Sequence, residues 1–130
     1  DIVKWQIRIA SGIPLNFTQD DVKLQGAAIE CRINAASCGT LSMLHVPGGP
    51  SVRFDTSLIE GTTVSPYYDS LLGKLIVFAK TREEALRKIK AALCELVIEG
   101  IPTNIEEQLN IVEDDRFTSG NYDLTFMSNR

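Results

Sequence analysis

The stretch Ala27-Ala-Ile-Glu-Cys-Arg-Ile-Asn-Ala35 alternates apolar and polar side chains over most of its length. Successive side chains of an extended chain point to opposite faces, so Glu30, Arg32 and Asn34 share one face and the apolar residues share the other. This period of two predicts a strand with one face in the core and one face toward solvent. The stretch from Leu71 to Ala79 is almost continuously apolar, which predicts a second strand that is buried on both faces.

Three helices are predicted from apolar periodicity and from end signals. Residues 2–11 form the first, with Asp1 as its cap. The capping box Thr81-Arg-Glu-Glu84 opens the second, in which Thr81 and Glu84 satisfy each other's free backbone donors. Asn104 is expected to cap the third. The core-facing stripe of the second helix comprises Ala85, Ile89, Ala92, Leu93 and Leu96.

The remaining pattern predicts further strands and sets the fold class. Residues 40–46 are a weak strand candidate, and alternation from Val52 to Leu58 predicts another, with the turn Pro47-Gly-Gly-Pro50 between them. Strands followed by helices favour an α+β fold. We expect a mostly antiparallel, barrel-sandwich-like sheet with flanking helices.

Composition limits the classes of function. A chain of 130 residues suggests one domain, and a net charge of −4 does not favour nucleic acid as a partner. No apolar run is long enough to predict a membrane span. The odd cysteine count and the cysteine spacings fit no metal site, so we expect reduced thiols in a cytoplasmic protein. The single histidine, His45, is expected to be structural or on the surface.

Local motifs for phosphate binding and carrier function are not present. Gly73-Lys74 is followed by leucine instead of serine or threonine, and the upstream glycine of a phosphate-binding loop is missing. No lysine lies between methionines, as the modified lysine of a biotin carrier typically does. Neighbouring carboxylates such as Glu83-Glu84 and Asp114-Asp115 are interpreted as solvated helix caps.

Two segments carry a resemblance to a known family. They are Gly26-Ala-Ala-Ile-Glu-Cys-Arg-Ile-Asn-Ala35 and Val64-Ser-Pro-Tyr-Tyr-Asp-Ser-Leu-Leu-Gly-Lys-Leu-Ile76. Together they strongly resemble the C-terminal domain of biotin carboxylases, including those of acetyl-CoA, propionyl-CoA and pyruvate carboxylases. The resemblance covers nearly the whole chain, because four further segments match in order: residues 1–12, 47–49 with 52–53, 81–85 and 98–104.

The resemblance implies that residues 1–130 form the closing domain of an ATP-grasp enzyme. In this family the upstream N-terminal and ATP-grasp domains bind ATP and Mg²⁺ or Mn²⁺, and neither belongs to this sequence. The chain begins at Asp1 without an initiator methionine, and we expect it to be part of a longer protein. After Ala35 it is several residues shorter than the family, through either a truncated loop or omitted residues.

The resemblance also implies roles for particular residues. Arg32 matches the family's catalytic arginine, which contacts biotin and bicarbonate and offsets negative charge on the ureido oxygen. Asp69, Glu30 and Tyr68 are expected around it, with Asp69 orienting the guanidinium. The residues alone also allow a simple ion pair between Arg32 and Glu30, a turn-capping role for Asp69, and packing roles for Tyr67 and Tyr68.

The implied reaction is ATP-dependent carboxylation of biotin by bicarbonate, of the acetyl-CoA carboxylase type used in fatty acid synthesis. The implied partners are the chain's own upstream ATP-grasp domain and a biotin carboxyl carrier protein. Arg53 and Pro50 match dimer contacts of bacterial members, although a solvated strand face would explain Arg53 equally well. The alternatives are a non-catalytic dimerisation or carrier-docking module, and the closing domain of another ATP-grasp ligase. We expect the isolated chain to fold and to be inactive.

Overall fold

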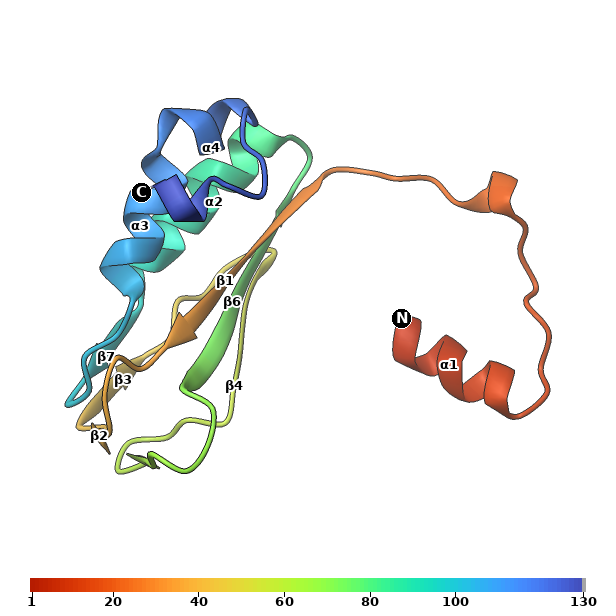
Figure 1. The fold of residues 1–130 in the computed structure, drawn as a ribbon. Coiled ribbons are helices and arrows are strands. Elements are labelled where there is room, and N and C mark those ends of the chain that lie inside the picture. Colours follow the sequence, from red (N-terminus) through yellow and green to blue (C-terminus); the bar gives the residue numbers. More distant parts are fainter. Residues whose placement is uncertain (130) are drawn as a thin grey trace.

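The computed structural model describes residues 1–129 and builds them around one three-stranded antiparallel sheet (Figure 1). Its strand order is β1 (Ala27–Asn34), β6 (Leu71–Ala79) and β4 (Val52–Thr56). The other elements, in chain order, are α1 (Ile2–Ala10), η1 (Gln19–Asp21), β2 (Gly39–Thr40), β3 (Met43–His45), β5 (Thr63–Val64), α2 (Arg82–Glu95), β7 (Val97–Glu99), α3 (Ile105–Glu113), α4 (Asp115–Ser119) and η2 (Met127–Asn129).

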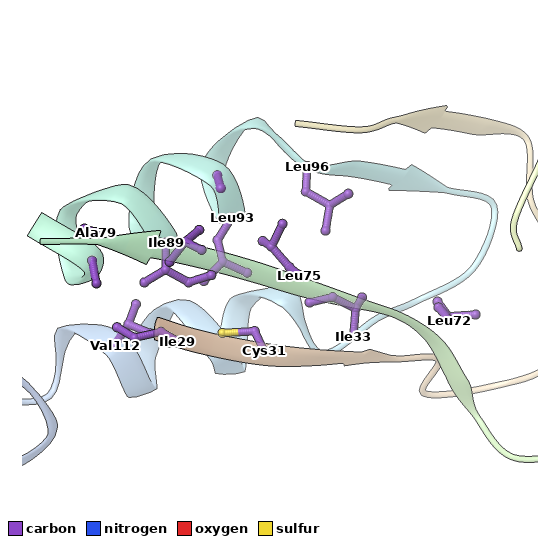
Figure 2. Packing of buried hydrophobic residues seen from close by; sticks show 13 residues of the cluster. Ile29, Cys31, Ile33, Leu72, Leu75, Ala79, Ile89, Leu93, Leu96 and Val112 are labelled. Atoms are coloured by element: carbon purple, nitrogen blue, oxygen red, sulfur yellow. The ribbon is translucent and has the colours of Figure 1, made fainter. Parts of the chain in front are cut away.

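The predicted alternation of β1 is confirmed, and it builds the core. Ile29, Cys31 and Ile33 are buried, whereas Glu30 and Arg32 are exposed. The buried face packs against α2 and α3 (Figure 2). Each buried isoleucine contributes about 1.5–3 kcal/mol, so the apolar face of β1 fixes which way the strand faces.

The prediction that β6 is buried on both faces is wrong. Its core face is buried through Leu75 and Val77, but Phe78 on the other face is 46% exposed. Both α2 and α3 pack on the core side of the sheet (Figure 1). The opposite side is therefore left to charged residues and to the ring of Phe78. A continuous apolar run cannot distinguish a strand buried on one face from a strand buried on both, because it carries no periodicity.

The weak strand predicted over residues 40–46 is two strands with different partners. β2 pairs with β5, and β3 pairs with β7, so the chain changes sheets at Leu41, which is buried. β7 was not predicted, because three residues are too few for a pattern. The α+β class is confirmed, but the three small sheets of residues 1–129 do not close into a barrel.

The helix predicted at the start is confirmed, including its cap. Asp1 Oδ1 accepts a hydrogen bond from Lys4 N at 3.1 Å. The helix stands apart from the sheet (Figure 1), so its apolar residues Val3 and Ile7 are each 63% exposed. Trp5 contacts Phe17 edge to face at 5.1 Å.

Gly100 joins β7 to the segment before α3, and we predict that it tolerates no side chain. It has a φ of +88°, and a Cβ there would lie 2.3 Å from the carbonyl oxygen of Thr40. We expect Gly100→Ala to lower the free energy of unfolding by about 2–4 kcal/mol, measured by urea denaturation.

Gly61→Ala is the matched control for this substitution. Gly61 has a φ of +84°, and no heavy atom lies within 4 Å of the added Cβ. The free energy of unfolding of Gly61→Ala should therefore fall only by the cost of holding an alanine in the left-handed backbone region, roughly 1–2 kcal/mol. Equal losses for the two variants would contradict the close approach of β2 to Gly100.

Candidate functional site

Arg32 projects from the solvent side of β1. Its side chain is 50% exposed, and its residue lies directly across the ladder from Lys74 on β6. Asp55 of β4 lies across from Lys74 in turn, and Arg53 lies across from Ile76. Cross-strand partners share a face of the sheet. These residues, with Glu30, form what we call the open face.

Asp69 is brought to Arg32 by the loop that precedes β6. Its Oδ2 lies 3.9 Å from Arg32 Nη2, and its Oδ1 accepts a hydrogen bond from Leu71 N at 2.9 Å. Asp69 therefore both caps its turn and presents a carboxylate to the guanidinium. At 3.9 Å the contact is an ion pair and is too long for a hydrogen bond, so it attracts the guanidinium without fixing its direction.

Glu30 does not form the predicted ion pair with Arg32. Its Oε1 lies 3.7 Å from Lys74 Nζ, so Lys74 and Arg32 each pair with a different carboxylate. Exposed pairs of this kind contribute about 0–1 kcal/mol to stability. The open face is therefore free to carry charge for recognition, since folding depends little on it.

Tyr67 and Tyr68 lie in the same loop as Asp69, and the interpretation of both as packing residues is wrong for the described chain. Their exposed fractions are 88% and 84%. Tyr67 N donates to Ser65 Oγ at 3.2 Å, which shapes the turn. The loop that carries Asp69 therefore also exposes two aromatic rings, which suit contact with a partner that has both apolar and polar groups.

Asn104 lies at the start of α3, as predicted, but its side chain does not cap that helix. Asn104 Oδ1 accepts from Asn34 N at 2.8 Å, and Asn104 Nδ2 donates to the carbonyl oxygen of Arg32 at 3.1 Å. Sequence reasoning missed this contact with the site. The only signal was an asparagine at a helix start, which is typical of a cap.

Arg53 and Pro50 lie at the other edge of the sheet. Arg53 Nε is 2.9 Å from Asp55 Oδ1, and the Arg53 side chain remains 67% exposed. The carbonyl oxygen of Pro50 accepts from Lys88 Nζ at 3.0 Å. Arg53 therefore shares the open face with Arg32, and both strands that carry these arginines are edge strands.

Cys31 is next to Arg32 but points into the core. Burial and, to a smaller extent, the Glu30 carboxylate raise the pKa of its thiol to about 11. Cys38 and Cys94 are exposed, and His45 Nε2 lies 3.4 Å from Glu95 Oε1. Across residues 1–129, no three metal-ligating side chains gather into a group, and no helix is long and apolar enough to cross a membrane.

Comparison with known proteins assigns this arrangement to a family. Residues 30–129 match the family model for the biotin carboxylase C-terminal domain. The biotin carboxylase of Haemophilus influenzae is 44% identical over 137 aligned positions, covering 100% of this chain and 31% of that protein. The chain thus spans about a third of the length of the curated relatives that it matches.

Solved structures agree with this assignment. The biotin carboxylase domain dimer of Hydrogenobacter thermophilus 2-oxoglutarate carboxylase, in complex with MgADP, ADP and bicarbonate, has a TM-score of 0.94 at 40% identity. It covers 99% of this chain and 30% of the solved chain. The biotin carboxylase subunit of a pyruvate carboxylase has a TM-score of 0.93 at 41% identity, with 99% and 30% covered.

We predict that the three thiols react in two classes. Cys38 and Cys94 are exposed and should react with a disulfide reagent at pH 8 in the folded chain. Cys31 is 3% exposed and stays protonated, so it should react only as fast as the domain opens. Cys31→Val should remove the slow class alone, and three equally fast thiols would contradict the burial of this residue.

Proposed function

The chain belongs to the family of biotin carboxylase C-terminal domains, and on this premise we propose that it completes the active site of an ATP-dependent biotin carboxylase. The observation that most supports the proposal is the half-exposed guanidinium of Arg32 on the open face, with Asp69 3.9 Å away. A permanent cation held at the surface of a rigid sheet can serve a neighbouring domain that closes over it.

Arg32 has two tasks in this reaction. It attracts bicarbonate, and it donates hydrogen bonds to the ureido oxygen of biotin as negative charge develops there. Guanidinium suits both, because it stays protonated and presents several donors in a fixed plane. Biotin, on its carrier, supplies the nitrogen that accepts the carboxyl group. ATP and its metal ion are bound by the upstream domains of the family.

The residues around Arg32 have supporting roles. Asp69 attracts the guanidinium without occupying its hydrogen-bond donors, because the two groups are 3.9 Å apart. Glu30 pairs with Lys74 and so reduces repulsion between Lys74 and Arg32, which face each other across the ladder. Tyr68 offers an exposed ring beside Asp69 for contact with the bound partner.

The same domain meets three partners in the proposed enzyme. The exposed apolar side chains of α1, including Ile2, Val3 and Ile7, suit packing against the upstream ATP-grasp domain. Arg53 and Pro50 contact a second copy, as a dimer exists for the Hydrogenobacter thermophilus relative. The biotin carboxyl carrier protein approaches the open face. We place the complete enzyme in the cytoplasm.

The carboxyl acceptor we propose is acetyl-CoA, in fatty acid synthesis. Some relatives are named simply as biotin carboxylases, and others belong to 2-oxoglutarate and pyruvate carboxylases. None of the residues on the open face contacts the final acceptor in this scheme, because the carboxyl group leaves on the carrier.

We predict that Arg32→Ala in the full-length protein lowers biotin-dependent turnover by about 10²–10³-fold, because one preorganised donor to developing charge is lost. Carboxylation of free biotin is the assay, and it also tests the biotin specificity that another ATP-grasp ligase would lack. Arg87→Ala is the matched control, since Arg87 is an exposed arginine on α2 paired only with Glu83 among the contacts found. Unchanged turnover of Arg32→Ala would instead favour a non-catalytic docking or dimerisation module.

We also predict that the isolated 130-residue chain folds but does not hydrolyse ATP. Folding is expected because a continuous core joins β1, β6, α2 and α3. Inactivity is expected because the family binds its nucleotide through upstream domains. A cooperative unfolding transition by circular dichroism and a bicarbonate-dependent phosphate-release assay check the two parts. Phosphate release above background would refute the second part.

A further inference from the structure

The side chain of Asn104 joins the start of α3 to the strand that carries Arg32. Its carboxamide bonds two backbone groups of β1: Nδ2 donates to the Arg32 carbonyl oxygen at 3.1 Å, and Oδ1 accepts from Asn34 N at 2.8 Å. Its own backbone N also donates to the Asn34 carbonyl oxygen at 3.1 Å. One residue therefore satisfies three backbone groups on the outer edge of β1, two residues apart.

These bonds lie where the ladder to β6 is irregular. β1 and β6 stay in register from Ala27 to Ile33, and the register shifts between Ile33 and Asn34. A bulge of this kind bends a strand and redirects nearby side chains. Since β1 is an edge strand, β6 holds only one of its sides. On the other side, the bond from Ala36 N to the Pro102 carbonyl oxygen holds the chain just beyond β1, and Asn104 holds β1 itself, immediately next to the bulge.

The side chain of Asn104 bonds β1 and does not cap α3. Asn104 occupies the N-cap position of α3, but its φ and ψ are −91° and 19°, and its side chain makes no capping hydrogen bond. An asparagine at this position ordinarily accepts from the second or third helical N–H. Here its carboxamide bonds β1 instead, so the helix end is less stable than its sequence allows.

The guanidinium of Arg32 depends on this backbone restraint. The contact found for its side chain is the 3.9 Å ion pair with Asp69, which sets no direction. The direction of the side chain is therefore set by the strand from which it projects. A displacement of about 1 Å at a charged catalytic group can reduce turnover by roughly 10²-fold.

We propose that Asn104 is a positioning residue for Arg32, one that holds the β1 backbone at the bulge and thereby aims the guanidinium. This inference rests on the proposed function of Arg32. Asn104 touches no reacting group. Its contribution passes through the Arg32 carbonyl oxygen and the Asn34 amide.

Two substitutions in the full-length enzyme test the inference. Asn104→Ala removes both side-chain bonds. Asn104→Asp keeps an acceptor for Asn34 N and a side chain suited to a helix start, but it removes the donor to the Arg32 carbonyl oxygen. We expect both variants to lower kcat for biotin carboxylation at least 10-fold, with the KM for ATP unchanged, because ATP is bound elsewhere.

A double-substitution cycle shows whether the effect passes through Arg32. In an Arg32→Ala background, Asn104→Ala should cause no further loss, since there is no guanidinium left to aim. An equal fold-loss in both backgrounds overturns the inference, as does wild-type turnover in the two single Asn104 variants. If Arg32→Ala itself leaves turnover unchanged, the proposed function fails and the inference falls with it.

Thr56→Val is the control for a loss of stability alone. Thr56 Oγ1 donates to the Leu72 carbonyl oxygen at 2.6 Å, which is a part-buried side-chain bond to the same sheet on the side away from β1. We expect this variant to shift the urea midpoint about as much as Asn104→Ala does while keeping wild-type kcat. A comparable loss of kcat in Thr56→Val would overturn the inference, because any weakening of the sheet would then be enough to lower kcat.

Discussion

The antiparallel pairing of β1 with β6 is the constraint on which the rest of the molecule depends. Cys31 lies across from Leu75, and Ile29 across from Val77, so each buried pair is matched by a solvent-facing pair next to it. A slip of one residue would turn the apolar set outward and place Arg32 in the core. A buried guanidinium without a partner is far too costly for that register to compete.

This pairing explains why charge collects on one side of the domain. The described chain contains no buried charged residue, and α2 and α3 occupy only the core side of the sheet. The other side holds alternating cations and carboxylates in weak, exposed pairs. Such pairs add little stability, so their arrangement is open to selection for recognition and catalysis.

The site combines segments that are distant in the chain. Arg32 comes from β1, Asp69 from the loop before β6, and Asn104 from the start of α3. The bulge at Asn34 lies where the three meet, because Ala35 N bonds Ser70 O and Ala36 N bonds Pro102 O. Backbone hydrogen bonds from two different segments thus flank the strand on both sides just beyond the proposed catalytic arginine.

Local pattern was sufficient where one periodicity dominated a long element. The alternation of β1, the stripe of α2 and the Asp1 and Thr81 caps were all readable from neighbouring residues. Pattern failed for β3 and β7, which are short, and for β6, whose face opposite the core is partly exposed. It also failed for Asn104, whose residue type and position are the same whether it caps α3 or holds β1.

The sequence by itself therefore determined the strands and helices with strong periodicity, the outward direction of Arg32, and the family. Tertiary structure alone decided which carboxylate pairs with Arg32, which sheet each half of residues 39–45 joins, and where the amide of Asn104 bonds. The physical reason is the separation along the chain over which each interaction acts. Periodicity and caps act between residues a few positions apart, whereas ion pairs and edge-strand hydrogen bonds form between groups that only the folded chain brings together.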